Sequence, residues 1–214
     1  MCRAAHRGAH QPTELHHVPP HQALRPPHRR ASLLHAQVPV VARCQVTDGS
    51  AAGCYYCPGF SHVIKFVGTQ LASPTINLAL YHNQMVEMVG TWNGTVLEVA
   101  SIQVVPDSFS IGGNTSLGHA MRPTAIEAPG TLALNLAALG TTFLVPFAEL
   151  AVMMNPASTV ILGAGVTNGN GEFKSDIDIP NDPSLVGLRV FGQALLFVNG
   201  GMRMSNVDAK EVSP

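Results

Sequence analysis

Histidines are concentrated near the start of this 214-residue chain, and imidazole is a common ligand of zinc and other transition metals. His16 and His17 are adjacent, and His17 and His21 are four residues apart, a spacing that puts two side chains on one face of a helix. Prolines on both sides of these residues oppose a stable helix. Two hypotheses therefore stand for this segment: a zinc site, or a solvated stretch with weak affinity for metals, which we favour.

Cysteines offer a second candidate for metal or redox chemistry. Cys54 and Cys57 form a C-x-x-C pair, and His62 follows closely, so the three could contribute to a zinc site. The chain has no second C-x-x-C pair, and a redox-active pair would need a helix that Pro58 and Gly59 do not begin. We favour the alternatives, which are free thiols or a disulfide that most simply joins Cys44 to Cys54 or Cys57.

Four carboxylates lie close together in the last quarter of the sequence: Glu172, Asp176, Asp178 and Asp182. Carboxylate oxygens are the ligands that calcium prefers, and a pair of carboxyl groups carries out acid–base catalysis in glycosidases. Asp176 and Asp178 also alternate with isoleucines, as on the polar face of an amphipathic strand. We favour the strand face over a calcium or catalytic site.

Motifs of the common enzyme classes are missing from the sequence. It contains no G-x-S-x-G nucleophile motif, no Walker A motif and no dinucleotide-binding glycine pattern. If the protein is an enzyme, the residues above favour a metal-dependent hydrolase that uses its histidines or acidic residues. Trp92 and Tyr81 could stack on a carbohydrate, although such aromatic residues more often belong to a core or a strand edge.

Short apolar segments separated by turn residues dominate from residue 63 onward, and no long helical pattern separates them. We predict a loop over 111–129 and a type I′ hairpin at Asn93-Gly94. The predicted strands are 63–67, 76–81, 85–89, 95–105, 131–139, 143–145, 150–154, 160–162, 172–179, 185–198 and 202–212. This spacing is typical of an all-β fold, and we predict an antiparallel β-sandwich, similar to a jelly roll.

The composition changes near residue 45. Residues 1–44 hold six arginines and one glutamate, whereas the rest of the chain holds six basic and twelve acidic residues. We predict an irregular segment rich in Pro, His and Arg over 1–50, followed by the β-sandwich domain over 51–214. The net charge of −1 favours no nucleic-acid partner, and no apolar run is long enough for a membrane-spanning helix. The first residues do not form a signal peptide.

A pattern near the carboxyl terminus carries a resemblance to a known class of domains. It reads G-x-F-x-x-x-I-x-I-P-x-D-P-x-L-V-G-L-x-x-x-x-Q-A and ends in S-N. Its residues are Gly171, Phe173, Ile177, Ile179, Pro180, Asp182, Pro183, Leu185, Val186, Gly187, Gln193, Ala194, Ser205 and Asn206. The pattern resembles the end of a β-sandwich domain of large predicted secreted proteins of planctomycete-like bacteria, and Cys57-Pro58-Gly59 is similar to the triplet that opens such domains. The resemblance implies an extracellular or cell-surface module, usually without known activity.

The same stretch also permits structural predictions from its residues alone. Gly187 and Gly192 should allow a bulge or a close approach of the backbone, and Gln193 must pair its amide with neighbouring backbone if it is buried.

The sequence does not determine an activity, but it favours an extracellular β-sandwich module with a binding or structural role. A carbohydrate or a cell-surface molecule is the candidate partner, and a homo-oligomer stays open. The alternative is the metal-dependent hydrolase, with zinc or calcium as the candidate cofactor.

Overall fold

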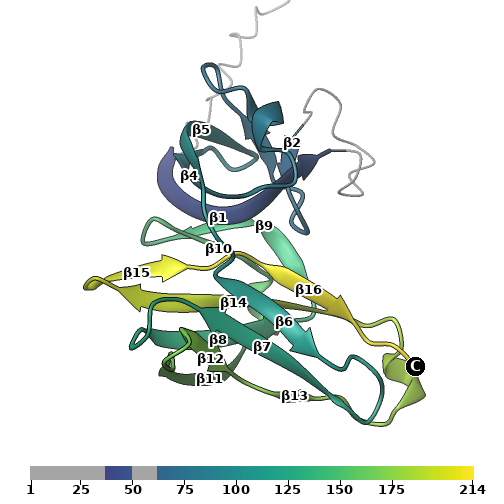
Figure 1. Cartoon of the computed structure of the whole chain (residues 1–214). Helices are drawn as coiled ribbons and strands as arrows, with labels where there is room; N and C mark the ends of the chain where they lie inside the picture. Colours follow the sequence, from purple (N-terminus) through teal and green to yellow (C-terminus); the bar gives the residue numbers. More distant parts are fainter. Residues whose placement is uncertain (1–36, 50–61) are drawn as a thin grey trace, which may run out of the picture. The chain divides into compact units, whose positions relative to one another are not determined.

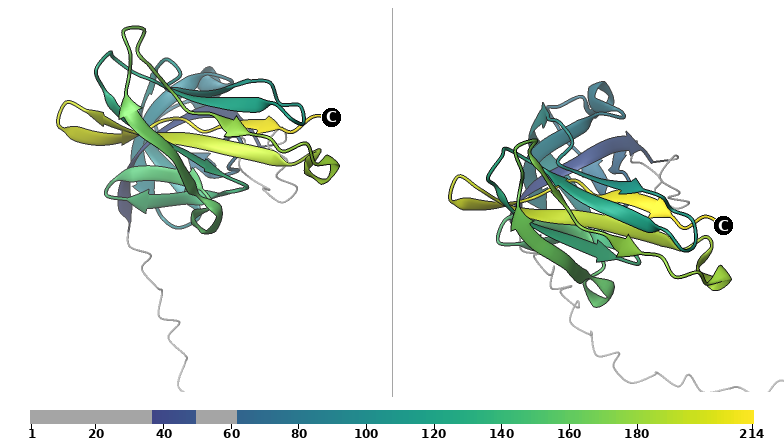
Figure 2. Two further views of the ribbon diagram at one scale, coloured as in Figure 1. Left: turned by 90° about the horizontal axis from the view of Figure 1, so that it is seen from below. Right: turned by 60° about the horizontal axis from the view of Figure 1, so that its bottom comes forward.

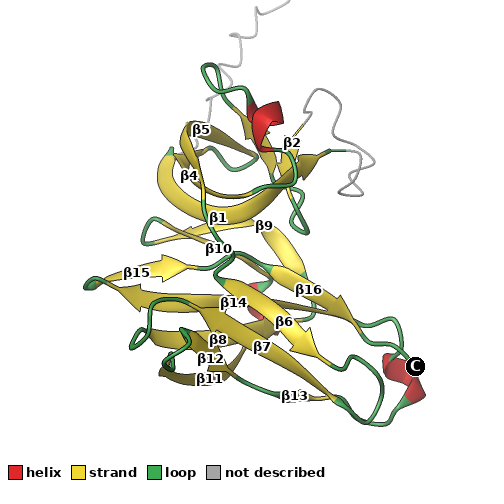
Figure 3. Cartoon of the chain, viewed as in Figure 1, coloured by secondary structure: helices red, strands yellow, loops and turns green. Residues whose placement is uncertain are grey.

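The computed structural model describes residues 37–49 and 62–214. The chain divides into two units, Met1–Leu34 and His35–Pro214, and all described residues belong to the second unit. This unit is all-β: its described residues form strands and three short 3₁₀ helices, and none forms an α-helix (Figures 1 and 3). The described residues include no helix of the length and apolar character needed to cross a membrane.

The sixteen strands of the described residues are β1 (Val38–Asp48), β2 (His62–Ile64), β3 (Gln70–Ala72), β4 (Met85–Trp92), β5 (Val96–Val104), β6 (Phe109–Gly113), β7 (Ala120–Ile126), β8 (Leu132–Ala138), β9 (Thr141–Phe147), β10 (Leu150–Met154), β11 (Val160–Val166), β12 (Glu172–Lys174), β13 (Ile177–Asp178), β14 (Arg189–Val198), β15 (Gly201–Met204) and β16 (Asp208–Glu211). The 3₁₀ helices are η1 (Leu78–Tyr81), η2 (Pro156–Ser158) and η3 (Pro183–Leu185).

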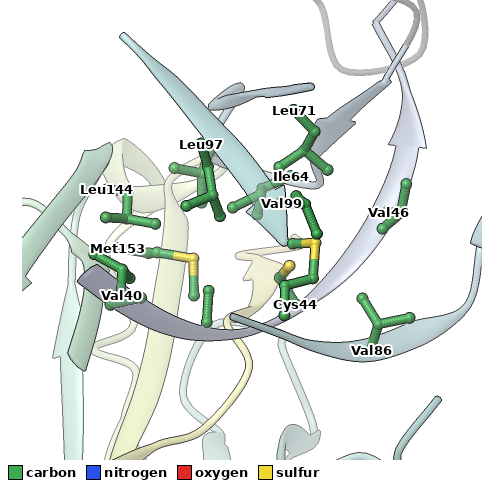
Figure 4. Packing of buried hydrophobic residues seen from close by; sticks show 14 of the residues in the cluster. Val40, Cys44, Val46, Ile64, Leu71, Val86, Leu97, Val99, Leu144 and Met153 are labelled. Atoms are coloured by element: carbon green, nitrogen blue, oxygen red, sulfur yellow. The ribbon is translucent and has the colours of Figure 1, made fainter. Parts of the chain in front are cut away.

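Strands β1 to β5 close into a barrel. Their order is β2-β3-β5-β4-β1, and β2 also pairs with β1, so that the hydrogen-bonded circuit is complete. All neighbours in the circuit are antiparallel except β3 and β5. Alternate residues of β1, including Val40, Cys44 and Val46, point into the barrel, where they meet Leu97 and Val99 of β5 (Figure 4). Side chains therefore fill the barrel as a core.

The β9–β10 hairpin extends this sheet beyond the barrel. β10 pairs with β1 in parallel at Leu150 and Val41, and β9 is the outermost strand. Leu144, Ala151 and Met153 of the hairpin are buried in the cluster that also fills the barrel. The hairpin therefore belongs to the barrel core as well as to its sheet.

Two further sheets share a second core. One has the order β11-β8-β14-β15, with β16 also paired to β14, and the other places β6 on one side of β7 and β12 and β13 on the opposite side (Figure 1). Phe109 and Met121 of the second sheet pack with Ala133, Ala194 and Leu196 of the first. Large residues of the second sheet thus pack against two alanines and a leucine of the first.

Gly192 shows how closely these two sheets approach. A Cβ atom at this position would lie 2.6 Å from two ring atoms of Phe109, which no side chain could tolerate without a shift. The close approach predicted for Gly192 is confirmed, and Gly187 adopts the left-handed backbone with φ +85°.

The structure confirms several predicted strands and corrects others. The strands expected over 95–105 and 131–139 are β5 and β8. The strand expected over 76–81 is absent: Leu78–Tyr81 form η1 instead, because the Asn77 side chain accepts a hydrogen bond from the Ala79 N–H and caps the turn. The loop predicted over 111–129 contains the end of β6 and all of β7.

The Asn93-Gly94 hairpin is confirmed, but its turn type is not I′. Gly94 has φ +96°, whereas Asn93 is not in the left-handed region that a type I′ turn needs at both positions. The Asn93 side-chain oxygen instead accepts the N–H groups of Thr95 and Val96 at 3.0 and 2.9 Å.

The predicted boundary near residue 50 is also corrected. β1 begins at Val38, within the segment predicted to be irregular, and pairs over eight positions with β4. The alternation of Val40, Ala42, Cys44 and Val46 was obscured by the arginine-rich composition of the flanking sequence. The barrel therefore includes residues on both sides of the change in composition.

Candidate functional site

A polar pocket of about 340 Å³ opens between the barrel and strands β6 and β16. Its walls come from β1, the β2–β3 turn, the start of β4, the connections before β6 and β16, and those two strands. We define the polar pocket by the side chains that can bind a ligand: Gln45, Lys65, Phe66, Asn83, Asp107 and Asp208.

The β2–β3 turn places Lys65 and Phe66 at the pocket. The carbonyl of Ile64 accepts the N–H groups of Val67 and Gly68 at 3.3 and 2.9 Å, which closes a tight turn. Phe66 has φ +67°, an unusual backbone conformation for a bulky residue. Such strain persists only where surrounding contacts impose it, and it occurs frequently at binding sites.

Contacts on two sides hold Phe66 in this conformation. Its ring meets the ring of Phe191 edge to face, with centroids 6.5 Å apart, and its carbonyl accepts a hydrogen bond from the Thr141 hydroxyl at 2.9 Å. Because β9 and β14 both contribute, the turn is anchored by the rest of the fold.

A chain of hydrogen bonds orders the polar side chains of the pocket. Lys65 Nζ donates to Gln45 Oε1 at 2.7 Å and lies 4.9 Å from the centroid of the Phe66 ring. Gln45 Nε2 in turn donates to the carbonyl of Asn83 at 2.8 Å. Asn83 also has a left-handed backbone, with φ +60°. The Lys65 ammonium and the Gln45 amide are therefore positioned before any ligand binds.

Two carboxylates complete the polar pocket. Asp208 accepts the backbone N–H groups of Ile111 and Ala209, each at 2.8 Å, so its position is fixed. Asp107 is exposed in the connection between β5 and β6. With Lys65 as the cation, the defined pocket has a formal charge of −1, which favours a neutral ligand over a polyanion.

The predicted metal ligands divide between residues inside and outside the described structure. His16, His17, His21, Cys54 and Cys57 lie outside the described residues. His62 begins β2; partial burial and the charge of His82 lower its pKa, while Asp48 opposes them. Within residues 37–49 and 62–214, no three His, Cys, Asp or Glu residues are grouped as a set that could hold a metal ion.

Three of the four carboxylates of the predicted acidic site have separate partners. Glu172 pairs with Lys174 at 2.7 Å, and Asp176 pairs with Arg122 at 2.8 Å. Asp182 caps η3 by accepting the Ser184 N–H, and that hydrogen bond lowers the pKa of its carboxyl group. Asp178 lies exposed on β13.

Two other residues weighed from the sequence belong to the core. Cys44 is a free thiol buried in the barrel, so the suggested disulfide to Cys54 or Cys57 is wrong, and burial raises its pKa. Trp92 is buried in the same cluster, and Tyr81 packs against it. These aromatic rings stabilise the barrel and do not form an exposed platform.

Sequence reasoning did not identify a second group of charges, which we call the charged cluster: Arg43, Glu87, Glu127 and Arg203. Arg43 pairs with Glu87 at 2.7 Å, and Arg203 pairs with Glu127. Burial and the charge of Arg43 lower the pKa of Arg203, although Glu87 opposes them. Since the two positive and two negative charges balance, the cluster is a weaker candidate for ligand binding than the polar pocket.

No local sequence motif could have revealed the polar pocket, because its residues come from separate segments. The residues of the Q-A and S-N pairs instead form a buried polar network. Gln193 donates to the carbonyls of Ala151 and Ser205 at 3.1 and 2.9 Å and accepts the Met153 N–H at 3.3 Å. This confirms that its amide pairs with backbone.

Asn206 connects the same network to β6. Its side-chain oxygen accepts the N–H groups of Ser108 and Phe109 at 2.8 and 3.0 Å, and its amide donates to the Phe109 carbonyl at 2.9 Å. The polar residues of the motif therefore have structural roles.

Comparison with known proteins identifies no relative: no family model, curated protein or solved structure matches the chain.

Proposed function

We propose that this protein is a non-enzymatic, extracellular binding module whose polar pocket binds a neutral carbohydrate. The observation that carries the proposal is the polar pocket, where two side-chain amides, two carboxylates and an ammonium group that lies over the Phe66 ring line one hollow. A sugar needs both donors and acceptors for its hydroxyl groups and an apolar surface for its C–H face. The pocket supplies all three.

The barrel gives this proposal support at the level of architecture. Its strand order and the parallel β3–β5 pair are those of a five-stranded Greek-key barrel of the OB type. Barrels of this type bind oligosaccharides or oligonucleotides. A fold alone does not decide between the two, but the formal charge of −1 at the polar pocket favours a neutral sugar.

We also propose that the two sheets beyond the barrel form a β-sandwich and that the protein is extracellular. The β8–β14 and β6–β7 sheets share one core, as the two layers of a sandwich do. An extracellular or cell-surface location rests on the resemblance of Gly171–Asn206 to domains of secreted bacterial proteins.

Calorimetric titration with a panel of neutral mono- and oligosaccharides tests this function. Lys65→Ala should weaken binding of the best sugar by about tenfold, the effect of losing a hydrogen bond to a charged group. Lys210→Ala, which removes an exposed lysine of β16 outside the pocket, is the matched control and should bind as the wild type does. Absence of binding to every sugar, or equal losses in both variants, would contradict the proposal.

A further inference from the structure

The sheet formed by β11, β8, β14 and β15 has an apolar face that points away from the second core. Along β8, Ala133 and Ala137 face that core, and Asn135 between them is fully buried. Because side chains alternate across a strand, Leu132, Leu134 and Leu136 point to the opposite face. The large residues of this strand are therefore on the side away from the core, and the small ones are inside.

The strand register places these three leucines in successive rows of side chains that cross the sheet. Val166, Leu132, Phe197 and Met202 are neighbours in register on β11, β8, β14 and β15. Figure 2 shows the backbone of these green to yellow strands from two further directions. They are 58%, 44%, 41% and 46% exposed. Ala164, Leu134 and Leu195 form the next row, and Ile161 opposite Leu136 is 67% exposed. We call these nine residues the leucine face: Leu132, Leu134, Leu136, Ile161, Ala164, Val166, Leu195, Phe197 and Met202.

The barrel covers only the adjoining part of this side of the sheet. On β14, the Phe191 ring contacts Phe66, and Gln193 is fully buried by its hydrogen bonds to Ala151 and Met153. Farther along the same strand, Leu195 is half-buried and Phe197 is exposed. The leucine face thus begins where the cover by β10 ends.

The composition and size of the leucine face indicate an interface. None of its nine residues is charged or polar, whereas the solvent-facing side of a sheet normally carries polar residues. Large side chains offer about 150–250 Å² each, so the exposed fractions amount to roughly 500 Å² of apolar surface, at the upper end for a monomer. Two such faces would bury roughly 1,000 Å², close to the 1,200 Å² of the smallest stable interfaces before any rim is counted.

The edge of the same sheet supports self-association independently. Among the described strands, β11 pairs with β8 alone, so its other edge is free of strand partners. Its sequence, VILGAGV, contains neither the lysine nor the proline that commonly protects an edge strand from another chain.

We propose that the protein forms a homodimer in which the leucine faces of two copies pack against each other. A two-fold axis brings identical patches together, so one uncharged face is complementary to itself. This interface leaves the polar pocket to its ligand, because the two sites share no residue.

Sedimentation velocity of the full chain over roughly 1–100 µM tests the dimer, which should have a Kd in the micromolar range or below. Val166→Glu and Phe197→Glu should raise the Kd by at least about tenfold, since each places two like charges in an apolar interface. Val104→Glu is the matched control: Val104 is a valine on β5 with 60% exposure, outside the leucine face, and its variant should dimerise as the wild type does.

Thermal unfolding of each variant monomer checks that the exposed substitutions leave the fold intact. A wild-type chain that stays monomeric over the whole concentration range would overturn the proposal. Binding of such a monomer to phosphatidylcholine vesicles would assign the leucine face to a lipid surface and would overturn the dimer too. A dimer that Val104→Glu weakens as much as Val166→Glu would place the interface elsewhere and overturn it as well.

Discussion

Replacing Gln193 with leucine should destabilise the protein severely, although leucine is apolar and similar in size. The Gln193 side chain makes three hydrogen bonds to the backbone of Ala151, Met153 and Ser205, all of which are fully buried. Leucine would leave two carbonyls and one N–H without these bonds inside the protein. A buried group that loses its partner costs about 1–3 kcal/mol.

The expected loss is about 3 kcal/mol, because the 3.3 Å bond from Met153 is long and contributes little. Domains of this kind have a free energy of unfolding of about 5–15 kcal/mol, so the loss is a large share of the total. Urea unfolding followed by the fluorescence of Trp92, the single tryptophan, measures it in the barrel core.

Gln84→Leu is the control for this measurement. Gln84 is exposed, and its side chain makes one hydrogen bond to the Leu80 carbonyl, so its replacement should change the free energy of unfolding by less than about 0.5 kcal/mol. If Gln193→Leu were as stable as Gln84→Leu, the buried amide would not connect β14 to β10 as described.

Two further changes test the core and the charged cluster. Gly192→Ala should cost at least about 1–3 kcal/mol by urea unfolding because its methyl group would overlap the ring of Phe109, whereas Gly169→Ala, in open space, should be nearly neutral. For Glu87, burial raises the pKa, but the hydrogen bond and charge of Arg43 outweigh it and the net pKa is lowered. A lowered folded-state pKa gives stability that is present above the unfolded value of about 4.3 and is lost as the pH falls through the folded value. Glu87→Gln should therefore be less stable than the wild type at pH 7, and urea midpoints should show the difference shrinking below about pH 4; a difference that grows on acidification would contradict the pairing.

Strand periodicity predicted much of the all-β fold because local alternation suffices for strands such as β5 and β8. It failed where glycine and proline occur inside strands. Gly112 and Pro123 suggested a loop, yet both lie in the β6–β7 pairing, where Gly112 is opposite Arg122 and Pro123 is opposite Ile111. The Pro123 carbonyl accepts the Ser175 N–H at 3.0 Å, a contact that only the tertiary fold supplies.

The orientation of β8 was also beyond the sequence pattern. Alternation in TLALNLAAL identifies a strand but not which face is buried. The close packing of Phe109 and Met121 leaves room for Ala133 and Ala137 on the inner side, so the leucines face outward. The large side chains of the opposing sheet thus determine which face of β8 is buried, and the β8 sequence alone does not contain that information.

The polar pocket could not be predicted because its residues have no common motif. Gln45, Lys65, Asn83, Asp107 and Asp208 come from segments that only barrel closure and the β16 pairing bring together. The left-handed conformation of Phe66 likewise depends on Thr141 and Phe191, which are distant in the sequence. The spacing of His, Cys and carboxylate residues, which we used to predict metal and acid–base sites, identified residues outside this pocket.

A titration of ¹⁵N-labelled protein with the best-binding neutral oligosaccharide, followed by NMR, tests the central claim most directly. The side-chain amide signals of Gln45 and Asn83 should shift in a saturable manner together with the backbone of the β2–β3 turn. The side-chain amide signals of Gln84 and Gln103, whose side chains do not line the polar pocket, should not shift. Shifts confined to other regions, or no saturable shift with any sugar, would contradict a carbohydrate site in this pocket.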